Sequence, residues 1–540
     1  MSQATSTVLA EPAPEQPSDR LLIDGHHLTI EETAEIARGD QRPTVGIADD
    51  ALVRMSNSLK LKRALVAAGQ PIYGVTAGFG DSNTRQIHGD KSADLQRNLL
   101  RFLNCGSGAA ASPEVTRATL LVRANCLARG HSAIRPQVAE LLLDCLNNDI
   151  LPIIPERGSV GASGDLVPLS YVARMLTGEG AVTMAGMRMP AGEALASIGL
   201  EPVVLEAKEG LALVNGTSFM SAFAALAVHD AERLAAVAEL CTALASQALA
   251  GNPAHFDDFL FQHKPHAGVL TSAANIRTLL GELGDVPEDD AAWLSDGFRR
   301  LSRPLQDRYS IRCAPHVIGA LRDTVAWAKE QLTVEINSSN DNPLFDHAAG
   351  EVRNGGNFYG SHVGIAMDSL KTAVASVGDL LDRQLALLVD EKFNNGLTPN
   401  LIPRFDPQDW EAGLHHGFKG MQIAASALVA EALRWTMPAT SFSRSTESHN
   451  QDKVSMGTIA ARDARSVVEL IEEVAAIHLL SACQAADLRG TDCLSPLTAD
   501  AHALLRRHSG LLDRDRSLAV ELAMTTTLLR SGALTDWLRG

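Results

Sequence analysis

The sequence is poor in the features that mark several large classes of protein. Aromatic residues make up only 4% of the 540 positions, while Ala and Leu dominate, and this bias favours helix over sheet. The formal net charge is −17, so the chain lacks the basic face that nucleic acid or an anionic membrane requires. We therefore expect neither kind of partner.

Cysteine pairs and a secretion signal are also missing. The 7 cysteines are odd in number and show no CxxC spacing, which argues against a disulfide framework and against a zinc cluster. Residues 1–20 lack the basic and apolar regions of a signal peptide and are rich in Pro, Glu and Ser. We expect a cytoplasmic protein with reduced thiols, no metal and a disordered tail over residues 1–20.

No long uncharged apolar run is found. The most apolar stretch, residues 218–251, contains Asp230, Glu232, Arg233 and Glu239. A membrane span needs about 20 predominantly apolar residues, so this stretch predicts a long core helix instead.

The patterning that is present is mainly helical. Residues 112–130 and 135–150 repeat apolar residues every three or four positions and predict helices. Short strands are expected within residues 180–205. From residue 218 onward the same apolar repeat predicts long helices, with ranges of 218–251, 268–284, 313–335, 361–393, 417–437, 458–488 and 516–534.

Several of these helices are far longer than the mean of about 11–12 residues. Such lengths indicate a bundle whose helices span the molecule and continue into partner subunits. We divide the chain into the tail, an N-terminal domain of residues 21–217 and a helical bundle of residues 218–540.

The segment GSVGASGD, residues 158–165, carries the main chemical signal. It has neither the GK[ST] nor the GxGxxG spacing of phosphate-binding loops. A tight turn before a helix explains the glycines, with Asp165 near the positive end of that helix. A chemical alternative uses the small residues Ala162, Ser163 and Gly164, because they let the backbone fold tightly on itself. The Gly164 nitrogen could then attack the Ala162 carbonyl carbon, and loss of water, including the Ser163 hydroxyl, would leave an electrophilic methylidene group.

The longer segment GSVGASGDLVPLSYVA, residues 158–173, resembles the signature of the aromatic amino acid ammonia-lyases and aminomutases. In that family, Ala-Ser-Gly forms the 4-methylidene-imidazol-5-one (MIO) group autocatalytically, and MIO makes the substrate amine a better leaving group. The resemblance covers residues 21–535 and is greatest to the bacterial phenylalanine ammonia-lyases. It implies that no metal, nucleotide or pyridoxal phosphate is required.

The same resemblance implies a fold. We expect a mainly α protein, a long-helix bundle of the aspartase/fumarase superfold with an MIO-bearing mixed N-terminal domain. The family forms homotetramers in which each active site draws loops from three chains, and the overlong helices agree with that architecture.

Other loops match the family closely enough to imply roles for single residues. Tyr73 in IYGVTAGFGDS is implied as the catalytic base, with Gly80 near the substrate. Asn215 in LALVNGTS is implied to donate to the MIO carbonyl oxygen, and Tyr309 in LQDRYSIRCAPH to stand close to MIO. Arg312 in that same loop is implied to hold the substrate carboxylate by a two-pronged contact.

Further residues are implied in substrate binding. Asn342 in NSSNDNPLF is a second contact to the carboxylate in the family, and Phe358 in GGNFYG lies beside MIO. The other matching positions are Gln306, Lys419, Glu447, Asn450 and Gln451. Two departures affect local hydrogen bonding: His316 stands where much of the family has Gln, and Gln422 where the plant enzymes usually have Glu.

Substrate choice is implied by Phe102 and Leu103 in LLRFLNCGSG, which face the substrate ring, with Leu166 nearby. Tyrosine-specific relatives have His at the first position, and histidine-specific relatives have Ser-His there and Glu in place of Gln451. An apolar wall leaves a buried phenol hydroxyl unpaired, at a cost of about 1–3 kcal/mol. We therefore expect L-phenylalanine as substrate and trans-cinnamate as product. The alternatives are a tyrosine or histidine ammonia-lyase, an aromatic 2,3-aminomutase, and a helical scaffold that has lost catalysis.

Overall fold

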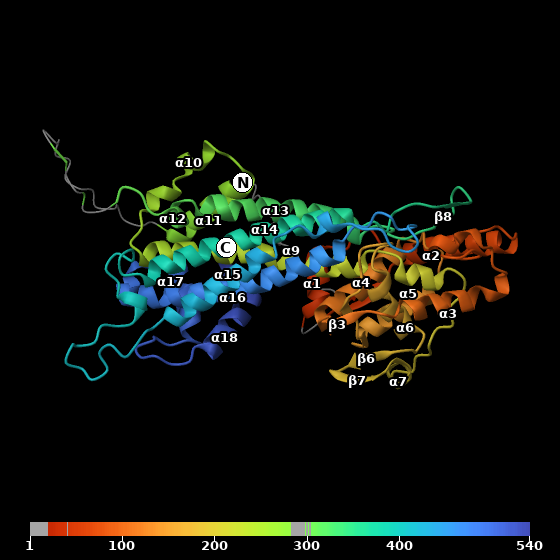
Figure 1. The fold of residues 1–540 in the computed structure, drawn as a ribbon, viewed down its shortest axis with the longest axis horizontal. Helices are drawn as coiled ribbons and strands as arrows, with labels where there is room; N and C mark the ends of the chain where they lie inside the picture. The colour runs from red at the N-terminus through yellow and green to blue at the C-terminus, as the bar shows by residue number, and fades with distance from the viewer. Residues whose placement is uncertain (1–19, 40–41, 282–296, 299–300, 302–303, 540) are drawn as a thin grey trace, which may run out of the picture.

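The arrangement of the chain was obtained from a computed structural model that describes residues 20–39, 42–281, 297–298, 301 and 304–539. The predicted tail, apart from Arg20, and the last three residues of the helix predicted at 268–284 lie outside the described residues. The described chain is mainly α-helical, with long helices aligned at one end and shorter elements gathered at the other (Figure 1).

The helices of the first half are short or of medium length. They are α1 (Ile30–Arg38), α2 (Asp49–Ala67), α3 (Ser92–Leu103), α4 (Pro113–Ala128), α5 (Pro136–Asn147), α6 (Leu166–Leu176), α7 (Ala191–Ser197) and α8 (Glu209–Val214). Those of the second half are α9 (Ser218–Ala248), α10 (Asp258–Gln262), α11 (Ala267–Leu280), α12 (Tyr309–Arg312), α13 (Ala314–Ile336), α14 (Ser361–Val389), α15 (Lys419–Arg434), α16 (Gly457–Arg489), α17 (Pro496–Arg506) and α18 (Ala519–Arg530).

The strands are short and form small sheets. The pairs are parallel β1 (Arg20–Ile23) with β2 (Thr44–Ile47), and antiparallel β3 (Ser107–Ala110) with β5 (Pro155–Arg157), β8 (Leu344–Asp346) with β9 (Glu351–Arg353), and β6 (Ala181–Met184) with both β4 (Leu151–Pro152) and β7 (Met187–Pro190).

The long helices predicted from residue 218 onward are confirmed, with ends that differ by a few residues. The short strands predicted within 180–205 are confirmed as β6 and β7, and residues 191–197 of the same range form α7. That segment, AGEALAS, is rich in good helix formers, and Pro190 immediately before it has extended backbone angles. The strands outside 180–205 were missed because two to four residues are too few to display a period of two.

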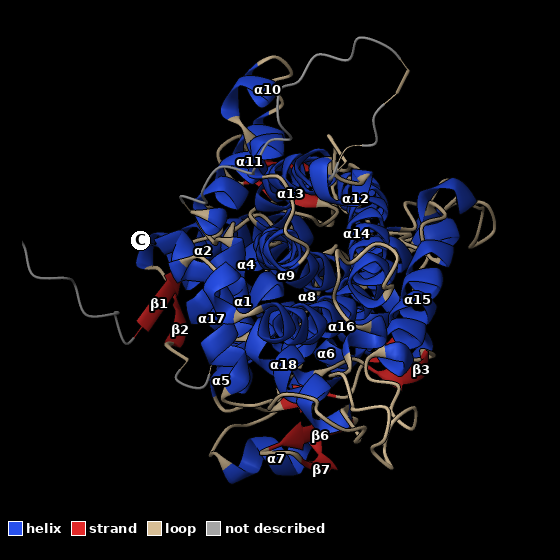
Figure 2. Cartoon of the chain, turned by 90° about the vertical axis from the view of Figure 1, so that its left-hand side faces the viewer, coloured by secondary structure: helices blue, strands red, loops and turns tan. Residues whose placement is uncertain are grey.

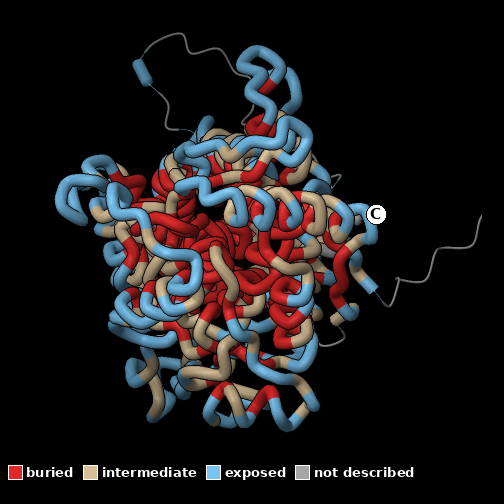
Figure 3. The backbone as a smooth tube through the Cα atoms, turned by 90° about the vertical axis from the view of Figure 1, so that its right-hand side faces the viewer, coloured by how far each residue is buried: buried red, intermediate tan, exposed pale blue. Residues whose placement is uncertain are grey.

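The core of the bundle is built from α9, α14 and α16, with α13 and α11 on one side and α15 on another (Figure 2). Nearly the whole of α9 is buried, and its many alanines let neighbouring backbones approach closely. Buried segments fill the middle of the molecule, while exposed loops form its rim (Figure 3). One hydrophobic cluster runs from α1 to α18, and the domain boundary at residue 217 stays a prediction. None of the helices in the described ranges combines the length and apolarity needed to cross a membrane.

Helix α16 sets the distance between the two ends of the bundle. Just before its start, the backbone N–H of Met456 donates to the Val160 carbonyl oxygen at 3.0 Å. At its end, Arg489 donates to the carbonyl oxygen of Ala248, where α9 also ends, at 2.9 Å. A helix of 33 residues is roughly 50 Å long. The glycine-rich segment and the C-terminal end of α9 are therefore separated by about this length.

Candidate active site

The glycine-rich segment forms a tight turn immediately before α6, as predicted. Ser163 and Gly164 have φ values of +50° and +73°, a region that non-glycine residues rarely occupy. A Cβ atom on Gly164 would lie 2.0 Å from the carbonyl oxygen of Gly216. Glycine is therefore required at position 164 both by its backbone conformation and by the space around it.

The loop after α8 pairs with this turn. The N–H of Gly216 donates to the carbonyl oxygen of Ser163 at 3.2 Å, and the N–H of Asp165 donates to the carbonyl oxygen of Gly216 at 2.7 Å. A backbone cyclisation across residues 162–164 fits three features of this turn. The side chains of Ala162 and Ser163 are small, φ is positive at Ser163 and Gly164, and no space is left for a side chain at Gly164. The residues present therefore suit an MIO group.

Asp165 is fully buried beneath the turn. It lies immediately before α6, near the positive end of that helix as predicted, without a capping hydrogen bond from its side chain. Its carboxylate accepts from the N–H of Met220 in the first turn of α9 at 2.8 Å. It also accepts from the hydroxyls of Thr458 at 2.5 Å and Ser159 at 3.2 Å. Burial raises the pKa of Asp165 to about 6, although these hydrogen bonds lower it. The carboxylate therefore joins α6, α9 and α16 under the turn.

Tyr73 and Glu447 meet around Gly80. The Tyr73 hydroxyl accepts from the N–H of Gly80 at 2.9 Å, and the Glu447 carboxylate accepts from the N–H of Asp81 at 3.0 Å. Burial raises the pKa of Tyr73, the Gly80 N–H lowers it, and the charge of Glu447 raises it. A Cβ atom on Gly80 would lie 2.3 Å from Glu447 Oε2, so only glycine lets these groups approach.

The loop that carries Glu447 also reaches Ser163. Gln451 Nε2 donates to Ser163 Oγ at 3.3 Å, and the N–H of Asn450 donates to the Glu447 carbonyl oxygen at 2.9 Å. Glu447, Ser448 and His449 all have positive φ values. This loop therefore places Glu447 against residues 80 and 81, where Gly80 contacts Tyr73, and Gln451 against Ser163.

Asn215 is held by groups that the sequence analysis did not single out. Its Nδ2 atom donates to Asp341 Oδ1 and to the Asn342 carbonyl oxygen, both at 3.0 Å. Both hydrogens of the Asn215 amide are used in these contacts, so neither donates to an MIO oxygen. The Ser163 carbonyl oxygen instead accepts from the N–H of Gly216. Asp341 immediately precedes the predicted residue Asn342 in NSSNDNPLF, and this adjacency is the only feature of the sequence that points to it.

Two buried cations accompany Asn215. Lys208 Nζ lies 2.6 Å from Asp341 Oδ2, and both side chains are buried. Arg123 is fully buried, and its Nη1 donates to the Asn215 carbonyl oxygen at 3.1 Å. Arg123 is a charged residue within the apolar run of α4, and this feature of the sequence could have identified it. Lys208 stands in an ordinary polar segment and offers no such signal.

The predicted apolar wall lies where α3 packs against α6. Leu103 is 8% exposed, and Leu166 is partly buried against the same cluster. Phe102 is 62% exposed in the single chain. Phe358 is partly buried in the loop before α14, and Asn342 Oδ1, also at this end, accepts from the N–H of Gly355 at 2.8 Å.

Four predicted site residues are not brought to this end: Gln306, Tyr309, Arg312 and Lys419. Helix α12, which contains Tyr309 and Arg312, lies at the opposite end of the molecule from α6 (Figure 1). Gln384 joins the Ser310 carbonyl oxygen to Thr242 Oγ1, each at 2.9 Å. Thr242 lies about six helical turns, or roughly 33 Å, along α9 from Met220. Met220 is the residue of the first turn that contacts Asp165.

The residues at the far end are accessible. Tyr309 is 72% exposed, and the Arg312 guanidinium lies 4.6 Å from the centre of its ring. Gln306 is exposed, and so is Lys419, the first residue of α15. Its neighbour Phe418 donates to the carbonyl oxygen of Asn400, in the loop that precedes α15. Arg312 is itself partly buried, and its Nε donates to the carbonyl oxygen of Asp307 at 3.1 Å. The other three side chains are exposed to groups outside their own chain.

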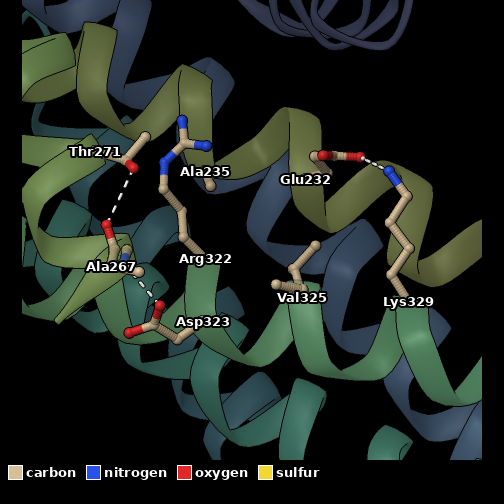
Figure 4. A pocket seen from close by; sticks show the side chains of 10 residues that line it. Glu232, Ala235, Ala267, Thr271, Arg322, Asp323, Val325 and Lys329 are labelled. Atoms are coloured by element: carbon tan, nitrogen blue, oxygen red, sulfur yellow. Dashed lines mark hydrogen bonds and ion pairs between the residues drawn. The ribbon is translucent and has the colours of Figure 1, made fainter.

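A hollow of about 270 Å³ between α9, α11 and α13 is not this site. Its charged lining is paired internally, as in the contact of Lys329 with Glu232 at 2.8 Å (Figure 4). None of the predicted site residues lines it. In the described part of the chain, no group of three or more His, Cys, Asp or Glu side chains is placed to hold a metal ion.

Comparisons with known proteins agree with this geometry. A family model described as aromatic amino acid lyase matches residues 28–507. The chain is 40% identical to a histidine ammonia-lyase of Sorangium cellulosum, over 95% of this chain and 98% of that protein. It is 39% identical to a tyrosine ammonia-lyase of Cupriavidus metallidurans, over 96% and 97%. The crystal structure of tyrosine aminomutase from Streptomyces globisporus matches with a TM-score of 0.90 and 37% identity, over 96% and 98%. The chain therefore belongs to the aromatic amino acid lyases, carbon–nitrogen lyases that form their MIO group from their own backbone and need no external cofactor.

Proposed function

We propose that this enzyme is a phenylalanine ammonia-lyase, which eliminates ammonia from L-phenylalanine and releases trans-cinnamate. The observation that carries the proposal is the contact of α3 with α6. Phe102 and Leu103 are the last two residues of α3, and Leu166, the second residue after the Ala-Ser-Gly triad, is the first residue of α6. These three side chains offer no hydrogen-bond donor or acceptor to a substrate ring.

The apolar wall disfavours polar rings. A phenol hydroxyl buried against it loses its water without a replacement, which costs about 1–3 kcal/mol, or about ten- to a hundredfold in preference. An imidazole ring carries two polar nitrogens and loses more. In addition, Gln451 is neutral, whereas the histidine-specific enzymes that the chain resembles have Glu at this position.

The chain's own residues supply binding and proton transfer. Once formed, MIO makes the substrate amine a better leaving group. Tyr73, as the phenolate, takes the β-proton of the substrate. Arg312 binds the substrate carboxylate through its guanidinium fork, with Asn342 as a second contact, and Gly216 donates to the Ser163 carbonyl oxygen as an oxyanion-type contact.

The proposed assembly is a homotetramer with shared active sites. Arg312, Tyr309, Gln306 and Lys419 lie at the far end of their own chain, so they serve a site that contains Ser163 of another subunit. The proposed location is the cytoplasm, which agrees with the 7 cysteines all being free thiols. The negative net charge supports the absence of nucleic acid and membrane partners.

A second candidate is a tyrosine or histidine ammonia-lyase, or an aromatic 2,3-aminomutase. It is favoured by the relatives themselves, since the similar proteins named above act on histidine or tyrosine by their names, and one is an aminomutase. An aminomutase returns ammonia to the β-carbon before release, so the reaction products distinguish it from a lyase.

The test is the wild-type enzyme supplied with L-phenylalanine. Cinnamate is followed by its ultraviolet absorbance, ammonia by a coupled assay, and β-phenylalanine by chromatography. The proposal predicts equal amounts of cinnamate and ammonia. Accumulation of β-phenylalanine identifies an aminomutase, and turnover confined to tyrosine or histidine identifies the other lyases.

A further inference from the structure

A single carboxylate fixes both ends of α8. Lys208 immediately precedes this helix and Asn215 immediately follows it. Asp341 contacts Lys208 Nζ through Oδ2 at 2.6 Å and Asn215 Nδ2 through Oδ1 at 3.0 Å. The three residues are 0%, 1% and 2% exposed in the order Lys208, Asp341, Asn215. Their arrangement is therefore set by protein contacts and not by solvent.

These contacts decide which way the Asn215 amide faces. Asp341 Oδ1 and the Asn342 carbonyl oxygen are both acceptors, and each lies 3.0 Å from Asn215 Nδ2. If the amide were turned over, its oxygen would meet two oxygens, one of them charged, in a buried site. The NH₂ group therefore faces Asp341. Asn215 Oδ1 is then a buried acceptor that has no hydrogen-bond partner in the described chain.

Lys208 keeps this arrangement stable. Its ammonium group lies against Oδ2 of the Asp341 carboxylate, so each carboxylate oxygen has a donor and Oδ1 stays directed at the Asn215 amide. The adjacent residue, Gly216, contacts the Ser163 carbonyl oxygen at 3.2 Å, so Asn215 stands next to the reacting triad. A substrate bound beside the triad can supply the donor that this buried acceptor lacks within the chain.

We propose that Asp341 and Lys208 are positioning residues, which hold Asn215 with its side-chain oxygen free to accept an N–H from the substrate amino group. The inference rests on the proposed lyase function, because the amine is the donor that Oδ1 meets. Asn215 is then an acceptor for the substrate, in contrast to the donor role that the family resemblance implied. Donation to the Ser163 carbonyl oxygen comes from Gly216.

The test exchanges the two polar partners. Asp341→Asn removes the charge that orients Asn215, and it is expected to lower kcat about a hundredfold with a smaller change in KM. The double variant Asp341→Asn/Asn215→Asp keeps one carboxylate, one amide and Lys208, and again leaves an acceptor at position 215. One oxygen of the carboxylate introduced at position 215 then faces the Asn342 carbonyl oxygen, so the recovery of activity is expected to be partial. The double variant is expected to be at least about tenfold more active than Asp341→Asn alone. If Asn215 acted as a donor, the exchange would abolish the remaining activity.

Two controls make the outcome decisive. The first is the intact mass, which reports whether each variant still loses two waters. The second is the variant Glu472→Gln. It removes another buried carboxylate, located in the middle of α16, which pairs with Arg530 at 2.7 Å. This control is expected to lower Tm and leave kcat unchanged. An exchanged chain that fails to fold, retains the two waters or is no more active than Asp341→Asn overturns the inference. Wild-type enzyme that releases no ammonia from phenylalanine overturns the proposed function instead.

Discussion

Arg312 and Ser163 lie at opposite ends of the bundle within one chain. Arg312 belongs to α12, which is tied to the C-terminal parts of α9 and α14 through Gln384. Ser163 lies beside the N-terminal ends of α9 and α16. Because the proposed reaction needs both residues on one substrate, they must come from different subunits.

Complementation between chains tests this arrangement. Tyr73→Phe and Arg312→Ala chains are each expected to be inactive. When they are mixed under conditions that allow subunit exchange, some sites combine a wild-type Tyr73 with a wild-type Arg312, and activity returns. The control mixes Tyr73→Phe with Ser163→Ala, since Tyr73 and Ser163 lie at the same end of the same chain. Equal recovery in both mixtures, or a fully active monomer, would refute the shared site.

Backbone cyclisation predicts a change in mass. The mature chain is expected to weigh two waters less than its sequence, because the ring closes between Ala162 and Gly164 and Ser163 loses its hydroxyl. Ser163→Ala removes the hydroxyl and is expected to show the full sequence mass and no turnover. Intact-mass spectrometry of both proteins checks this, and active wild-type protein at its full sequence mass would contradict it.

The sequence predicted the bundle well because its signal is local and repeated. In α9, nearly all of the 31 residues are buried, and so long a run of apolar residues is visible in the sequence alone. The strands outside residues 180–205 escaped prediction because they are very short, as in β4 with only two residues. Its existence depends on pairing with β6, which is a tertiary contact.

The sequence motifs point to candidate site residues, but they do not reveal the contacts between those residues. Gln451 donates to Ser163 and Tyr73 accepts from Gly80, while the roles that the resemblance implies for these residues stay predictions. The orientation of Asn215 depends on Asp341, which is 126 positions away in the sequence, and on the buried Lys208. Such long-range pairs leave no local pattern in a single sequence.

The pH dependence of the reaction follows from Tyr73. Burial, and in addition the charge of Glu447, raise the pKa of Tyr73 above its usual value of 10.0, while the Gly80 N–H lowers it. Tyr73 takes a proton only when ionised, so kcat/KM is expected to rise with pH into the alkaline range. Glu447→Gln removes a negative charge and is expected to move this ascending limb to lower pH.

A pH profile of kcat/KM for wild type and Glu447→Gln checks the direction. The exposed carboxylate of Glu193 in α7 provides the control, since Glu193→Gln is expected to leave the profile in place. A limb that stays fixed or moves to higher pH in Glu447→Gln would show that Glu447 does not act on Tyr73.

Substrate preference is expected to respond to Phe102. Phe102→His introduces a donor beside the substrate ring, which satisfies a phenol hydroxyl that the wild-type wall leaves unpaired. The ratio of kcat/KM for tyrosine over phenylalanine is expected to rise about ten- to a hundredfold. Phe102→Leu serves as the control, because it changes the shape of the wall and adds no polar group. An equal rise in both variants would assign the effect to space and not to hydrogen bonding.

The most direct test of the central claim compares kcat/KM of the wild-type enzyme for L-phenylalanine, L-tyrosine and L-histidine, each supplied alone. Product formation is followed by ultraviolet absorbance together with ammonia release. The account predicts that phenylalanine is preferred over tyrosine by about ten- to a hundredfold and that histidine is poorer still. A higher kcat/KM for tyrosine or histidine than for phenylalanine would contradict the proposed substrate while leaving the lyase family intact.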